Sequence, residues 1–81
     1  MPYLLLIESD TLLKAKHKCM INTTSLEELT EGICESLKLD QPDLLIEMYD
    51  KDFEEWIALD NFGLMEGTNK AKLRVSPSTA S

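Results

Sequence analysis

One stretch of helical periodicity, residues 26–39, lies among segments whose apolar residues follow strand patterns. Its apolar stripe consists of Leu26, Leu29, Ile33 and Leu37. Two capping boxes fit its start, Ser25 with Glu28 and Thr24 with Glu27. A single amphipathic helix has to cover one face of a sheet. The sequence therefore predicts an α+β fold, with one helix packed on a mixed sheet.

Five segments have strand character: residues 3–8, 13–21, 44–49, 56–59 and 71–75. The first is a continuous apolar run, which predicts a strand buried on both faces in the middle of the sheet. The second alternates, and its predicted core face consists of Leu13, Ala15, His17, Cys19 and Ile21. The order ββαβββ, with a short hairpin and a right-handed crossover, predicts a β-grasp (ubiquitin-like) arrangement.

The predicted domain spans residues 1–75, and residues 76–81 are expected to form a disordered tail or the start of a linker. Residues 40–43 are expected to end the helix. Phe62 and Leu64, in the connection before the last strand, are expected to pack into the core.

The net charge of −7 is unevenly distributed along the chain. Residues 1–22 balance to +1, residues 23–63 to −10 and residues 64–81 to +2. Strong overall acidity argues against nucleic acid and against anionic membranes as partners. No apolar run approaches the roughly 20 residues that span a bilayer, and no signal peptide is expected. The sequence favours a soluble intracellular domain, cytoplasmic or nuclear.

Catalytic and metal-binding motifs are not apparent. His17 is the only histidine and is expected to pack toward the core, and no nucleophile motif or phosphate-binding glycine loop is present. Cys19 and Cys34 are interpreted as small buried residues, with a single disulfide as the alternative. The acidic segment lacks the glycine and flanking helices of an EF-hand. We expect no enzyme activity, no cofactor and no metal site.

Carboxylates concentrate between the third and fourth predicted strands: Asp50, Asp52, Glu54 and Glu55, with Asp60 after the fourth strand. Together with Tyr49, this pattern resembles the acidic loop of Phox-and-Bem-type interaction domains. It is also similar to the ubiquitin-like modules found with sterile-alpha-motif proteins. The resemblance covers the element order from residues 3 to 75, and the motif from residues 44 to 60 only. It implies that these carboxylates dock on a basic surface of a protein partner.

The basic counterpart that the resemblance implies is Lys14, Lys16 and Lys18. The family usually has a glycine where Phe53 stands, and a lysine in the first strand where this chain has none. The lysines and the acidic loop are expected on opposed sides of the sheet, which would allow copies to stack head to tail. Edge-strand lysines equally protect against unwanted strand pairing, and an acidic cluster can be a solvated loop without a binding role.

Two aromatic residues are candidate binding anchors, Phe53 at the loop tip and Trp56 on the next strand. For Trp56, a place in the core is the alternative. We therefore expect a non-enzymatic interaction module for scaffolding or signalling, which docks its acidic loop on a partner or on another copy in a homo-oligomer. The alternative is a regulatory ubiquitin-like domain without self-association, which binds through an apolar sheet surface that includes Trp56 and Leu59.

Overall fold

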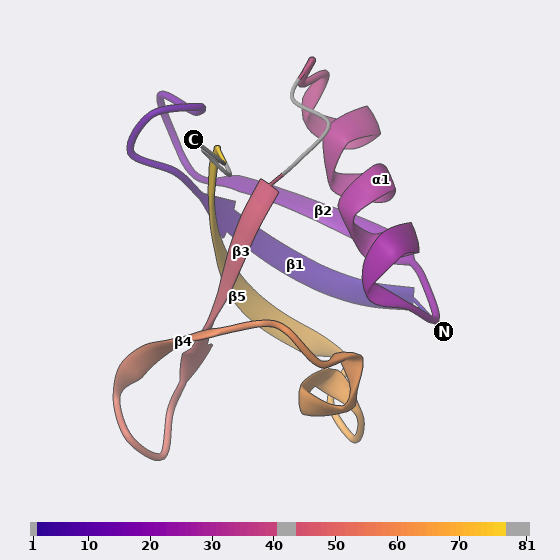
Figure 1. Cartoon of the computed structure of the whole chain (residues 1–81), viewed down its shortest axis with the longest axis vertical. Helices are drawn as coiled ribbons and strands as arrows, with labels where there is room; N and C mark the ends of the chain where they lie inside the picture. The colour runs from indigo at the N-terminus through magenta and orange to yellow at the C-terminus, as the bar shows by residue number, and fades with distance from the viewer. Residues whose placement is uncertain (1, 41–43, 78–81) are drawn as a thin grey trace.

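A five-stranded mixed sheet and one helix make up the protein in a computed structural model, which describes residues 2–40 and 44–77. Figure 1 shows the helix on one face of the sheet, beside β1 and β2. The elements are β1 (Pro2–Glu8), β2 (His17–Asn22), α1 (Leu26–Leu37), β3 (Leu44–Asp50), β4 (Glu55–Ala58), the 3₁₀ helix η1 (Phe62–Met65) and β5 (Lys70–Pro77). The predicted α+β class, with one helix and a mixed sheet, is confirmed.

The strands lie in the order β2-β1-β5-β3-β4, so β2 and β4 are the two edges. β1 and β5 run parallel, and the other neighbouring pairs are antiparallel. β5 is therefore the middle strand, although it comes last along the chain. It joins the β1–β2 hairpin to the β3–β4 hairpin.

Helix α1 begins where the sequence predicts, with Ser25 as its N-cap. The Ser25 hydroxyl accepts the Glu28 N–H at 3.2 Å, and the Glu28 carboxylate accepts hydrogen bonds from the hydroxyl and the N–H of Thr24. Of the two candidate N-caps, the structure therefore uses Ser25. The Glu28 carboxylate binds Thr24, and the Ser25 N–H donates to the Thr23 hydroxyl, so only the serine half of a capping box is formed. The helix ends at Lys38, which is in the left-handed conformation with φ 55°. Residues 41–43 of the expected helix break lie outside the described residues.

The core lies between α1 and the sheet face below it. Its fully buried members are Leu5, Ile7, Leu29, Ile33, Met65, Leu73 and Val75. The expectation that the first strand is buried on both faces is wrong, because Tyr3, Leu5 and Ile7 are buried while Leu4 and Leu6 are only half-buried. One helix can cover only one face of the sheet. We call the other face, on which Leu4 and Leu6 lie, the open face.

The connection before β5 packs Phe62 against the core as expected, but it buries Met65 in place of Leu64. Phe62 is half-buried and packs edge-on against Tyr3, with ring centroids 5.8 Å apart. Leu64, however, is 42% exposed, and Met65 is the buried member of η1. Residues three apart share one side of a 3₁₀ helix, so Phe62 and Met65 face the core and Leu64 faces solvent.

The last strand is longer than predicted. β5 continues through Ser76 and Pro77, which pair with Leu45 and Leu44 of β3. The expected tail therefore does not begin at residue 76, and its residues 78–81 lie outside the described residues. Within the described ranges, no helix is long and apolar enough to cross a membrane.

Candidate functional site

The acidic loop, defined here as residues 50–55, is the tight turn of the β3–β4 hairpin. Asp50 ends β3 and pairs with Glu55, which begins β4. The Asp50 carboxylate accepts the N–H of Asp52 at 2.9 Å, and Glu54 adopts a left-handed conformation with φ 54°. The residue that takes the conformation favoured by glycine is thus Glu54, and Phe53 does not need it. The missing glycine does not prevent a tight turn.

The acidic loop presents its side chains to solvent. Residues 51–55 are all exposed, and Phe53 has an exposed fraction of 75%. Among the described residues, Arg74 and Glu47 form the one ion pair, so no carboxylate of the loop is paired. An unpaired acidic cluster around an exposed aromatic side chain is available to a basic partner.

Asp60 does not join the acidic loop. It follows β4 at the opposite end of that strand from Glu55, roughly 15 Å away for five residues of extended chain. There it lies beside the start of α1, in a depression that Leu26 and Phe62 also line. The structure therefore brings together four of the five predicted acidic residues.

The predicted basic strand is shorter than its alternating pattern. β2 begins at His17, so Lys14 and Lys16 lie in the β1–β2 connection and only Lys18 lies on the strand. The reason is that β1 ends at Glu8, which leaves the residues before 17 without a partner strand. β2 and β4 are opposite edges of the sheet, as the predicted opposed sides require.

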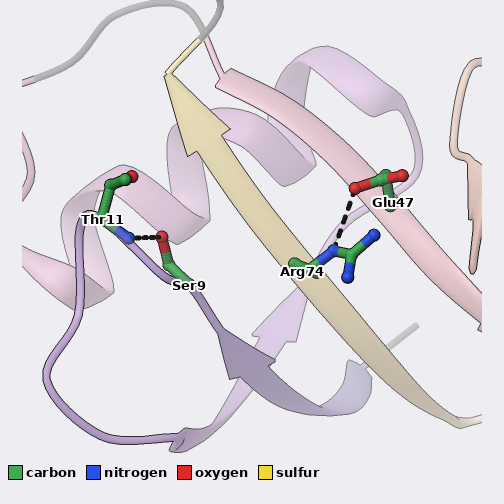
Figure 2. Close-up of polar contacts among 4 residues, drawn as sticks. All are labelled: Ser9, Thr11, Glu47 and Arg74. Atoms are coloured by element: carbon green, nitrogen blue, oxygen red, sulfur yellow. Dashed lines mark hydrogen bonds and ion pairs between the residues drawn. The ribbon is translucent and has the colours of Figure 1, made fainter.

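The turn after β1 is stabilised by a hydroxyl group. Ser9 accepts the N–H of Thr11 at 3.3 Å, which Figure 2 shows, and the N–H of Leu12 at 3.0 Å. His17, expected to face the core, is exposed at the end of this connection, and so is Ala15. Of the predicted inward residues, Leu13 and Cys19 pack against the core and Ile21 is buried.

A hollow of about 320 Å³ lies on the open face, and we call it the lysine hollow. Half-buried Leu4 and Leu6 line it together with Lys18, Lys51, Lys70 and Lys72. Leu6 of β1 pairs with Lys18 on one side and with Lys72 on the other, so these three side chains form one row across the sheet. Sequence reasoning missed this cluster, because the parallel pairing of β1 with β5 creates it.

Aromatic rings and cations continue this row toward β4. Tyr49 and Trp56 pack edge to face, with ring centroids 5.4 Å apart. The Lys72 ammonium lies 5.1 Å from the Tyr49 ring centroid, and the Arg74 guanidinium lies 4.6 Å from that of Trp56. Trp56 is half-buried on the open face, so it is not a core plug.

The open face also carries the ion pair between Arg74 and Glu47. Arg74 of β5 donates its Nε–H to the Glu47 carboxylate of β3 at 3.0 Å, and Figure 2 shows the two side chains reaching across neighbouring strands. This hydrogen bond raises the pKa of Arg74. Arg74 is held by Glu47 and Trp56 and is less available to a partner than the lysines.

Metal-binding groups and thiols are the other candidates for chemistry in the described parts of the chain. No group of three or more His, Cys, Asp or Glu side chains there could hold a metal ion. Cys19 and Cys34 are both thiols and half-buried, and burial raises the pKa of each. A raised pKa lowers the thiolate fraction, which makes either group a poor nucleophile at neutral pH.

Comparison with known proteins identifies no family for this chain. No protein-family model matches the sequence, and no curated protein matches it.

Proposed function

We propose that this chain is a β-grasp protein–protein interaction module, without catalytic activity, that docks its acidic loop on a basic surface of a partner or of another copy. The resemblance to Phox-and-Bem-type domains supports this proposal through the pattern of the loop. The setting that we propose is intracellular scaffolding or signalling.

The β-grasp assignment is supported by the strand order β2-β1-β5-β3-β4 around one helix. The N-terminal hairpin and the crossover helix are features on which the sequence-based prediction rests. The place of β5 beside β1 adds support that the sequence alone did not supply. The short η1 helix between β4 and β5 is compatible with this arrangement.

The observation that carries the binding proposal is the exposure of the acidic loop. Four carboxylates without ion pairs lie in the same turn as Phe53, whose exposed fraction is 75%. Like charges held together in a tight turn repel one another, and their solvated carboxylates add little to fold stability. A basic partner would relieve this repulsion and cover the aromatic ring.

A second candidate function is binding through the apolar part of the open face. Met20 and Leu45 lie on that face with exposed fractions of 64% and 50%. Leu59 is 6% exposed and belongs to the core, so this version cannot use it. Trp56 remains available to a partner in this second version.

Capture of partners from a cell lysate tests the proposal when loop and control variants are compared. The loop variant is Asp50→Asn/Asp52→Asn/Glu54→Gln, which removes three charges. The control is Glu31→Gln/Glu35→Gln/Glu66→Gln, which removes three exposed charges elsewhere. We expect proteins that the wild type and the control capture, and that the loop variant does not.

Salt separates the two candidate functions. The Debye length falls from about 30 Å at 0.01 M to about 3 Å at 1 M ionic strength, so docking through the acidic loop weakens as salt is added. Apolar docking on the open face would survive high salt. If the loop variant changes neither the captured proteins nor the solution mass of the chain, the proposal is wrong.

A further inference from the structure

The lysine hollow is a positively charged surface in a chain whose net charge is −7. Among the described residues, Lys18, Lys51 and Lys70 form neither an ion pair nor a cation–π contact. Leu4 and Leu6 supply an apolar floor beneath them. Such a surface complements an acidic segment that also carries one apolar side chain.

The acidic loop of the same chain has this composition. Phe53 stands between Asp52 and Glu54, and Lys51 is its one basic residue. Because Phe53 is 75% exposed, the loop does not place its ring in the hollow of its own chain. Loop and hollow are thus complementary surfaces that remain unfilled in a single copy.

We propose that two copies of the chain dimerise by exchanging acidic loops. Phe53 of each copy packs on Leu4 and Leu6 of the other, and the loop carboxylates pair with Lys18 and Lys70. This inference rests on the proposed function and names the partner of the loop as a second copy.

The position of the loop beside the hollow favours a closed dimer over a chain of copies. Lys51 belongs to the loop and also lines the hollow. An adjoining depression is lined by Asp50 and Asp52 of the loop and by Lys70. When the loop of one copy meets the hollow of the other, the second loop is brought toward the first hollow. A two-fold axis then satisfies both contacts at once.

Closure also has an energetic advantage. Two loop–hollow contacts form for one loss of translational and rotational freedom, whereas an open chain loses that freedom for each contact. The exposed carboxylates and lysines of the two copies attract one another before contact. In the dimer, the Phe53 ring becomes buried and forms the apolar centre of the contact.

Sedimentation equilibrium over a wide concentration range, at low and high salt, tests the inference. At low salt the wild-type mass is expected to rise to twice the monomer mass and then to stay constant. Lys18→Glu/Lys70→Glu should raise the dissociation constant of the dimer about tenfold or more. Lys14→Glu/Lys16→Glu makes the same change of charge in the β1–β2 connection and should leave the dimer intact. Phe53→Ser, at an exposed position, should weaken the dimer without affecting folding.

A charge-swap experiment distinguishes loss of the dimer contact from misfolding of a variant. Asp52→Lys/Glu54→Lys alone should be monomeric at low salt. Mixed with Lys18→Glu/Lys70→Glu, it should form a heterodimer, because both loop–hollow contacts regain opposite charges. Recovery of the dimer in the mixture shows that each variant is folded.

Three results would overturn the inference: a monomer at every concentration and salt, a mass that grows beyond the dimer, or equal loss in the Lys14→Glu/Lys16→Glu control. If the wild type is monomeric but still captures other proteins through its loop, the dimer is wrong and the proposed function stands. If capture from lysate is also independent of the loop, both are wrong.

Discussion

Gly32 of α1 lies directly against Ile21 of β2. A Cβ atom added at Gly32 would be 2.8 Å from Cγ2 of Ile21. This contact accounts for a glycine in the middle of a helix, where it costs about 1 kcal/mol relative to alanine. The absence of a side chain lets α1 approach the sheet closely.

We expect Gly32→Ala to destabilise the fold by about 1–3 kcal/mol, although alanine is the better helix former, because the new methyl group overpacks the core. Urea denaturation measures the difference. Ile21→Leu removes the Cγ2 methyl, so Gly32→Ala should cost less in that background than in the wild type. Glu35→Ala, on the exposed side of α1, is the control and should change stability little. A stabilised Gly32→Ala variant would show that the contact is not restrictive.

Trp56, the only tryptophan, reports on the charge of the open face. Lys72 and Arg74 lie over its ring, so anions should concentrate around it. We expect iodide to quench its fluorescence at least about twice as strongly as caesium at low ionic strength, since local potential raises counter-ion concentration. Lys72→Glu should reduce this difference, and Lys38→Glu on the far side of the chain should not. Equal quenching by the two ions in the wild type would contradict the arrangement.

The two thiols should react slowly near neutral pH. Burial raises the pKa of Cys19 and of Cys34, although a hydrogen bond with Ser36 partly opposes the shift at Cys19. The reactive thiolate is therefore scarcer than in an unfolded chain, and the labelling rate should still be rising as the pH passes 9. A chromogenic disulfide reagent measures this rate, with Cys19→Ser and Cys34→Ser to separate the two groups. Labelling in denaturant provides the reference, and equal rates in the folded and denatured chain would be inconsistent with burial.

The hydrogen bonds at the start of α1 should make stability depend on acid pH. The Thr24 hydroxyl and backbone N–H donate to Glu28 and lower the pKa of its carboxyl below the usual 4.5. The folded state therefore binds a proton less readily than the unfolded state. The stabilisation is complete above the unfolded pKa and is lost as pH falls through the lower, folded value.

We expect the stability difference between wild type and Glu28→Gln to be constant above about pH 5, near the ordinary glutamate pKa, and to shrink below it. NMR titration of the Glu28 side chain measures the shift directly. Thr24→Val removes the hydroxyl donor and should raise the pKa of Glu28 toward its usual value. An unchanged pKa in Thr24→Val would show that the hydroxyl is not the main cause.

Local patterns in the sequence predicted the helix and its cap well. The stripe that includes Leu29 and Ile33 became the buried face of α1, and Ser25 became its N-cap. These features depend on neighbours within one or two turns. The class of fold followed, because one amphipathic helix requires a sheet to cover.

The alternating pattern from residue 13 predicted a longer β2 than the structure has. A period of two can occur in a segment that has no partner strand. Lys14, Lys16 and His17 continue the pattern, but β1 offers no partner before the pair Ile7–His17. The length of a neighbouring strand sets this limit, and a single segment does not contain that information.

The carboxylates of the acidic loop lie in one sequence segment and could be predicted from it. The lysines of the lysine hollow do not, and sequence reasoning missed them. Lys18, Lys51 and Lys70 come from three distant parts of the sequence and meet only because β5 inserts beside β1. Trp56 was ambiguous for the same reason. Its place depends on Tyr49 and Arg74, which reach it across two strand pairings.

The central place of β5 has a consequence for synthesis on the ribosome. Until residues 70–77 emerge, the β1–β2 and β3–β4 hairpins have no strand to join them, because neither hairpin pairs with the other. While β5 is inside the exit tunnel, the core-facing sides of the two hairpins therefore remain exposed. We therefore expect the sheet to close only after β5 has emerged, and chaperone contact to be most useful to this chain before that point.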